Sequence, residues 1–150
     1  MATAESTYVE PSALARVYLH QYGSPEISRW CAKAEGPISI THHGKIEITN
    51  AICRAAFVKD IDEATLRKTL LDFDQDLVEG RFGIADILWR SALNRAAELS
   101  RAYTPKLGVR SLDLLHVACA LELGRRFFLT FDAKQLELAK VTGLKPVRLL

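Results

Sequence analysis

Four carboxylates stand where metal-binding or catalytic acids often lie in proteins that alternate strands and helices. Glu10 follows the apolar run "TYV", and Asp132 follows "RFFLTF". Asp113 falls in the first turn of one expected helix, and Glu47 falls in the second turn of the expected helix that follows "ISI". If the strands are parallel, strand ends and helix starts share one side of the sheet, where open α/β sheets bind ligands. Four converging carboxylates would need a cation, and hard oxygen ligands suit Mg²⁺ or Mn²⁺.

Each of these acids also has an ordinary structural explanation. Asp113 could interact with the dipole of its own helix, and Asp132 could cap the helix of "AKQLELA". Glu10 could be a surface acid and Glu47 a solvated helix residue. The residue types alone leave both interpretations open at every position.

The elements that would position the acids follow from short apolar runs alternating with longer helical patterns, which predict an α/β fold with a mainly parallel sheet. Strands are expected at Thr7–Val9 and within "GPISIT", "RFGIADILW" and "RFFLTF". Helices are expected at 12–21, 25–34, 42–58, from Asp62 to about Glu79, at 89–103, and from about Leu112 to Gly124. The expected helix caps are Ser12, Thr41, Asp62 and Ser111, and Ile46 is expected on the apolar face of its helix.

Composition favours an ordinary globular protein. The 150 residues are 49% hydrophobic and 25% charged, and we expect one domain over residues 1–150. No apolar run reaches membrane-spanning length, and "MATAES" lacks the pattern of a signal peptide, so a cytoplasmic protein is expected. The net charge of +2 is too small to identify a nucleic-acid partner. Cys31, Cys53 and Cys119 lack metal-site spacing and are expected to be small buried hydrophobic residues.

Four segments, taken in order and spacing, resemble the successive motifs of PIN-domain ribonucleases, and particularly of VapC-type toxins. They are "YVEPSALARVYL", "ISITHHGKIEITNAICRAA", "RSLDLLHVACALELG" and "FFLTFDAKQLELAKVTGLKPV". The resemblance covers nearly the full chain, and the last two segments are the most specific.

This resemblance implies a three-layer α/β/α sandwich with a central, mainly parallel sheet. It implies that Glu10, Glu47, Asp113 and Asp132 gather around Mg²⁺ or Mn²⁺ and that the protein cleaves RNA phosphodiesters. An antitoxin protein and a second copy of the chain, forming a homodimer, are the partners that it implies.

One departure from the family pattern lies at the first acid, where Glu10-Pro11-Ser12 replaces the usual Asp-Thr-Ser. Glu is one methylene longer than Asp, and Pro11 fixes φ and lacks an N–H. Mg²⁺ demands near-octahedral geometry at about 2.0 to 2.1 Å. Two hypotheses therefore stand: a metal-dependent endoribonuclease, and a weakened or inactive PIN-fold module that binds RNA or a protein partner.

Several neighbouring residues could support either function. Ser12 and Thr130 could hydrogen-bond waters of a metal site, although capping and strand roles also explain them. His116 could orient Asp113 or contact RNA, or it could be a packed, hydrogen-bonded histidine. His42 and His43 are expected on the surface. The basic residues nearest to the acids in sequence, expected to contact the RNA backbone, are Arg16, Lys45, Arg110 and Lys134.

Overall fold

The computed structural model describes residues 1–149, which form two compact units. Unit 1 combines residues 1–10 with residues 86–148, so it is built from both ends of the chain. Unit 2 is the continuous segment 11–85, together with Leu149. Both units contain parallel strand pairs and helices, which confirms the α/β class. The single domain expected over residues 1–150 stays a prediction.

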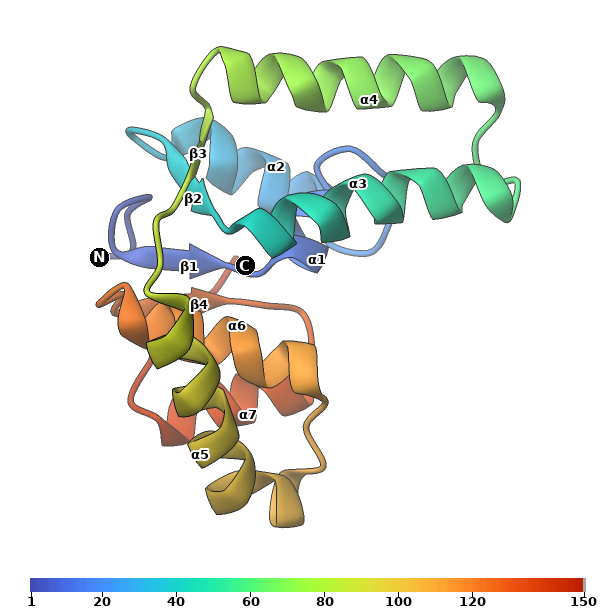
Figure 1. Ribbon diagram of the computed structural model, residues 1–150. Coiled ribbons are helices and arrows are strands. Elements are labelled where there is room, and N and C mark those ends of the chain that lie inside the picture. The colour runs from blue at the N-terminus through green and yellow to red at the C-terminus, as the bar shows by residue number, and fades with distance from the viewer. Residues whose placement is uncertain (150) are drawn as a thin grey trace. The chain divides into compact units, whose positions relative to one another are not determined.

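The sheet of unit 1 has three parallel strands in the order β1-β4-β5. They are β1 (Thr7–Val9), β4 (Phe127–Leu129) and β5 (Lys145–Pro146), and Figure 1 shows β1 beside β4. Thr7 pairs with Phe127 and Val9 with Leu129, so β1 and β4 end at the same edge. The sequence predicted β1 and β4. It did not predict β5, whose two residues are too few to show an alternating or continuous apolar pattern.

Three helices complete unit 1: α5 (Trp89–Leu107), α6 (Ser111–Glu122) and α7 (Ala133–Val141). Their apolar faces share one core with the sheet, in which Tyr8 and Phe128 stack in parallel planes with ring centroids 5.5 Å apart. The helix α5 continues past Tyr103 and through Pro105 to Leu107. The cap residue that follows is Gly108, whose φ of 64° is the left-handed conformation that favours glycine. Arg110, rather than the expected Ser111, occupies the cap position of α6.

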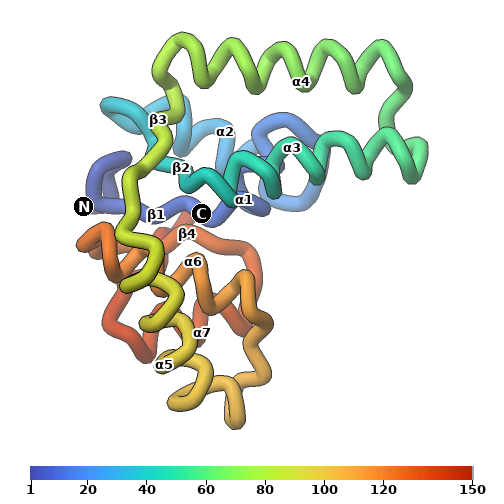
Figure 2. Tube along the Cα trace, in the orientation of Figure 1, coloured from blue at the N-terminus to red at the C-terminus, as the bar shows by residue number. Residues whose placement is uncertain are grey.

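Unit 2 pairs two parallel strands, β2 (Ile38–Ile40) and β3 (Phe82–Ile84). Its helices are α1 (Pro11–Ala15), α2 (Ser24–Lys33), α3 (His42–Phe57) and α4 (Glu63–Val78). Figure 2 shows α3 and α4 as two long neighbouring helices joined by a short turn. The predicted caps of both helices are present: Thr41 Oγ1 accepts from Gly44 N at 2.9 Å, and Asp62 Oδ1 accepts from Thr65 N at 2.7 Å. A side-chain hydrogen bond with Thr65, followed by this main-chain bond, keeps the pKa of Asp62 below its usual value.

Two local predictions in unit 2 were wrong. The first helix ends at Ala15 rather than Gln21, and tight turns follow in which Arg16 and Val17 donate to main-chain oxygens three residues back. Ser24 stabilises the next bend by donating to the Leu19 carbonyl at 2.8 Å. Ile46 is 68% exposed, because the buried side of α3 is formed instead by Ile48, Ile52 and their neighbours.

An aromatic cluster fills the core of unit 2. Phe73 lies edge-on to Tyr18 with ring centroids 5.4 Å apart, and Phe82 packs against both rings. The Tyr18 hydroxyl donates to Asp76 Oδ2 at 2.5 Å. Burial, followed by this bond to a carboxylate, raises the pKa of Tyr18 far above its usual value. The tyrosine therefore stays neutral and anchors α4 to the segment after α1.

The three cysteines differ in environment, which corrects the expectation that all are buried. Cys119 is buried in the core of unit 1, Cys31 is half-buried and Cys53 is exposed on α3. Burial raises the pKa of the Cys31 and Cys119 thiols to about 12 in each case. Both thiols are therefore neutral at ordinary pH, and the thiol form is a poorer nucleophile than the thiolate.

Candidate active site

The loop after β4 holds Asp132 in a network of short hydrogen bonds. Asp132 Oδ1 accepts from the main-chain N–H of Gln135 at 2.8 Å and so caps α7. Thr130 Oγ1 accepts from the Asp132 N–H at 3.1 Å and donates to Gln135 Oε1 at 2.6 Å. Gln135 is almost fully buried, and its side-chain amide reaches the main-chain oxygen of Asp113 at 3.4 Å. The start of α7 is thereby tied to the first turn of α6.

Asp113 and Asp132 line the same open pocket, which has a volume of about 490 Å³. It lies entirely within unit 1, and two of the predicted basic residues, Arg110 and Lys134, also line it. Arg110 Nε lies 3.7 Å from Asp113 Oδ2, but the Arg110 side chain is 86% exposed, so this contact is weak and screened by solvent. The pocket therefore presents two carboxylates for a cation beside two exposed cationic groups suited to phosphate.

Glu10 lies at the end of β1, next to the end of β4. Its main-chain N–H donates to the Leu129 carbonyl at 3.0 Å, which extends the pairing of β1 and β4 by one bond. The residue is only 6% exposed, so it is not a surface acid. Glu10 does not line the pocket that Asp113 and Asp132 share. Its carboxylate oxygen Oε1 lies 3.9 Å from His116 Nε2.

Glu10, Asp113 and Asp132 lie toward one end of the sheet of unit 1 but do not form a tight cluster. Within residues 1–149, their carboxylate oxygens are not all within 4.8 Å of one another, the spacing at which one ion could touch all three. Mg²⁺ commonly keeps several water ligands and binds through one or two carboxylates. Asp113 and Asp132, with Glu10 at the neighbouring strand end, therefore offer the kind of oxygen donors that such divalent ions prefer.

His116 is fully buried on α6 and is packed rather than open to solvent. The Tyr8 hydroxyl lies 2.7 Å from its Nδ1, a hydrogen bond that joins β1 to α6. A side chain without solvent exposure cannot contact RNA directly. The His116 Nε2 lies 3.9 Å from a carboxylate oxygen of Glu10.

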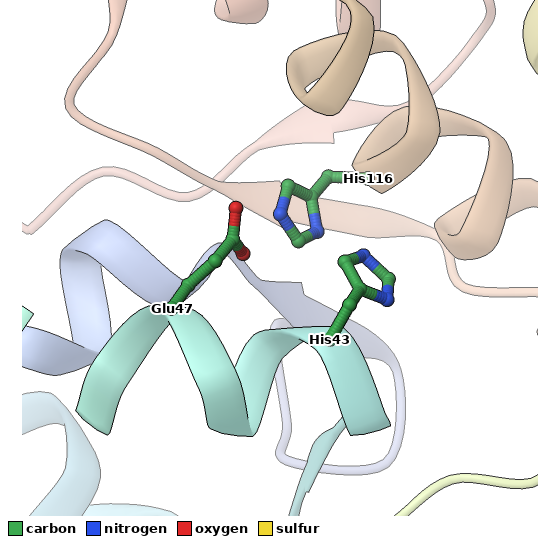
Figure 3. Close-up of side chains that lie close together, drawn as sticks. All are labelled: His43, Glu47 and His116. Carbon is green, nitrogen blue, oxygen red and sulfur yellow. The ribbon is translucent and has the colours of Figure 1, made fainter. Parts of the chain in front are cut away.

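The fourth predicted acid, Glu47, belongs to unit 2. It is half-buried on α3, one turn after the half-buried His43, and Figure 3 shows both side chains on the same side of that helix. A nitrogen of His43 and a carboxylate oxygen of Glu47 lie within 4.8 Å of each other. Thr41 fixes where α3 begins and hence where this pair projects. His42 is exposed, as expected, whereas His43 is half-buried rather than on the surface.

The remaining predicted residues of unit 2 play more local parts. Ser12 is exposed inside α1 and does not cap it as expected, because Pro11 already occupies the first helical position. The Arg16 guanidinium donates to the Tyr22 carbonyl at 2.5 Å, so this charged group stabilises the loop that follows α1. Lys45 is exposed on α3 and stays available to a phosphate ligand.

Tyr8 and Gln135 organise the site but were not predicted from the sequence. Gln135 carried a usable signal, because Asp132 and Gln135 have the spacing of a capping box, in which a cap residue is followed three positions later by Glu or Gln. Tyr8 carried none, since its partner His116 is 108 residues away in sequence.

No protein-family model and no curated protein matches this sequence. Among residues 1–149, no helix combines the length and the apolar character needed to cross a membrane. The functional argument therefore depends on the residues of the site and on the motifs of the chain.

Proposed function

We propose that this protein is a metal-dependent endoribonuclease with a PIN-like, three-layer α/β/α fold around a mainly parallel sheet. The observation that carries the proposal is the shared pocket of Asp113 and Asp132, with Arg110 and Lys134 beside them. Glu10 supports it from the adjacent end of β1. An acidic site with flanking cations suits a phosphodiester, whose charge needs both a metal and basic groups.

Each acid has a distinct part in this proposal. Asp113 and Asp132 would hold Mg²⁺ or Mn²⁺ at the pocket, with Glu10 as a further carboxylate. Glu47 is the fourth ligand on the strength of the motif resemblance alone. A bound divalent ion would polarise the scissile phosphate and lower the pKa of the attacking water. Thr130 and Gln135 would keep Asp132 in place throughout.

The basic residues would bind the RNA backbone rather than read its bases. Arg110 and Lys134 border the pocket with exposed side chains, so they could reach phosphates on either side of the cleaved bond. Lys45 is a further candidate from sequence. Arg16 is the weakest of the four, because its guanidinium is engaged with the Tyr22 carbonyl.

The biological setting that we propose comes from the resemblance to VapC-type toxins. It comprises a cytoplasmic toxin, an antitoxin protein that inhibits it, and a homodimer as the active assembly. Light scattering of the purified chain would measure the last of these directly. A small protein encoded beside this chain that suppresses its RNA cleavage would support the other two.

A second candidate function is a PIN-fold module that binds RNA or a protein without cutting. The observation that favours it is the position of Glu10, which is buried, faces His116 and does not line the acidic pocket. A carboxylate held away from the ion would leave the metal site incomplete.

Incubation of the purified chain with labelled RNA, with Mg²⁺, Mn²⁺ or EDTA, separates the two functions. The nuclease predicts cleavage that needs a divalent ion and disappears in Asp113→Asn. Asp74→Asn, which changes an exposed acid on α4, is the matched control and should cleave normally. Intact RNA that is nevertheless retained by the protein in a binding assay would favour the second function.

A further inference from the structure

The buried pair Tyr8 and His116 joins the first strand to α6 beside the Glu10 carboxylate. The Tyr8 hydroxyl is 2.7 Å from His116 Nδ1, and His116 has no solvent exposure. Stacking on Phe128 fixes the Tyr8 ring, so the hydroxyl has little freedom to move away. The imidazole is therefore held in one orientation, with Nε2 on the side of Glu10 Oε1.

The two contacts of the His116 ring favour one of its two neutral tautomers. A neutral imidazole has one N–H donor and one acceptor nitrogen. If Tyr8 donates to Nδ1, the proton resides on Nε2, and an N–H dipole lies toward the anionic carboxylate of Glu10. The opposite tautomer would place the Nε2 lone pair against that carboxylate, which is electrostatically unfavourable. Tyr8 thus favours the form of His116 that attracts Glu10.

We propose that His116, kept in its Nε2–H form by Tyr8, is a positioning residue that orients the Glu10 carboxylate. The present separation of 3.9 Å is longer than a hydrogen bond, so the interaction is a directed attraction that a small side-chain rotation would close. Glu has one more rotatable bond than Asp and needs more restraint to act as a ligand. The inference relies on the proposed function in one respect, namely that Glu10 binds the metal.

Two substitutions of similar size separate positioning from packing. The amide nitrogen of Gln reaches approximately the place of Nε2, whereas the amide of Asn mimics Nδ1. His116→Asn can keep the Tyr8 contact but loses the donor toward Glu10, and His116→Gln does the reverse. By analogy with other residues that orient metal ligands, calorimetric titration should show Mn²⁺ binding weakened about 10-fold in His116→Asn and within about threefold of wild type in His116→Gln.

The same titration in a Glu10→Gln background checks the route of the effect. There the two His116 variants should bind Mn²⁺ equally, because the carboxylate that they position is gone. The proposal would be overturned if His116→Asn and His116→Gln bound Mn²⁺ equally in the protein that keeps Glu10, or if His116→Asn bound it more tightly. Thermal melting of each variant identifies losses that reflect unfolding alone.

A metal-free measurement tests the arrangement separately from the proposed nuclease. Nitrogen-15 NMR of His116 should show the Nε2–H tautomer in wild type and a mixture in Tyr8→Phe, which keeps the ring but removes the hydroxyl. The Glu10 carboxyl carbon shift should also differ between wild type and Tyr8→Phe. An Nδ1–H tautomer in wild type would overturn the inference. Absence of Mn²⁺ binding with the predicted tautomer and shift would instead contradict the proposed nuclease and leave the positioning of Glu10 supported.

Discussion

Asp132 Oδ1 accepts the main-chain N–H of Gln135 at 2.8 Å while the same side chain lines the pocket that it shares with Asp113. One carboxylate thus caps a helix and faces a candidate metal site. The two roles depend on different properties, because a cap needs an acceptor oxygen and a metal ligand here needs negative charge.

Asp132→Asn is therefore expected to separate stability from activity. Asn caps helices about as well as Asp, so the free energy of unfolding should change by less than about 0.5 kcal/mol, whereas Asp132→Ala should lose about 1 kcal/mol. Both variants should reduce RNA cleavage to the level seen with EDTA. Chemical denaturation and a cleavage assay measure the two effects, and full cleavage by Asp132→Asn would exclude a ligand role.

Asp113→Asn is expected to abolish metal-dependent cleavage and to leave the fold intact. Removal of one of several neighbouring negative charges should leave the metal-free protein as stable as wild type or slightly more so. Glu47→Gln should have the same effect on cleavage if α3 contributes the fourth ligand. Circular dichroism melting with and without Mn²⁺ provides the stability readout, and unchanged cleavage in both variants would rule out this set of acids.

Glu10→Asp and Glu10→Gln should shift metal dependence in opposite directions. Asp restores the shorter side chain of the PIN pattern and should raise activity with Mg²⁺ more than with Mn²⁺, because Mg²⁺ is stricter about ligand placement. Gln removes the charge, so metal affinity and cleavage should fall together. Since Glu10 is buried, the lost methylene in Asp should cost about 1 kcal/mol of stability. Identical Mn²⁺ isotherms for all three proteins would mean that Glu10 is not a ligand.

Gly44→Ala should weaken the start of α3. A Cβ at this position would lie 2.9 Å from the capping Thr41 Oγ1 and 3.1 Å from Pro11 Cγ, both closer than ordinary contacts. We expect a loss of about 1 to 3 kcal/mol, as for other overpacked sites. Lys45→Ala, at the exposed neighbouring position, is the control and should be nearly neutral. Equal denaturation midpoints for the two variants would contradict this account of the helix start.

The buried thiol of Cys119 should make stability fall in alkaline solution. Its pKa rises from the ordinary value of 9.0 to about 12 in the folded chain because of burial. Below pH 9 the thiol is protonated in both states, so its contribution is fully present. Above that, the unfolded chain releases the proton and the folded chain does not, so stability declines until the folded pKa is passed. Denaturant unfolding at about pH 8 and about pH 10.5 should therefore show a smaller decline in Cys119→Ala than in wild type or in Cys53→Ser, which changes an exposed thiol.

The sequence predicted those features that depend on neighbouring residues. The runs that form β1, β2, β3 and β4 were identified, and so were the caps Thr41 and Asp62, because a short polar side chain before a helical pattern has a local physical meaning. The end of α1 was missed because "ALARVYLHQY" continues a helical period that the turn contacts of Arg16 and Val17 override.

The candidate site was only partly accessible from sequence. Asp113 and Asp132 could be assigned to one sheet edge by the rule for parallel strands, and they do line one pocket. A packed His116 was one of the two alternatives at the level of sequence. The burial of Glu10 and its proximity to His116 could not be foreseen, because they result from packing between segments more than a hundred residues apart. Ile46 shows the same limit, since the periodicity of α3 did not determine which of its faces would be covered.

Unit 2 is almost wholly one continuous segment, whereas unit 1 is built from both chain ends. This difference sets the order in which the two units can fold during synthesis. Residues 11–85 can complete their contacts as soon as they leave the ribosome. The first strand must instead wait for β4, which is translated more than a hundred residues later, before Val9 can pair with Leu129. Glu10, Asp113 and Asp132 therefore reach their final surroundings only near the end of translation. We therefore expect a nascent chain of this protein to fold residues 11–85 well before its acidic pocket can form.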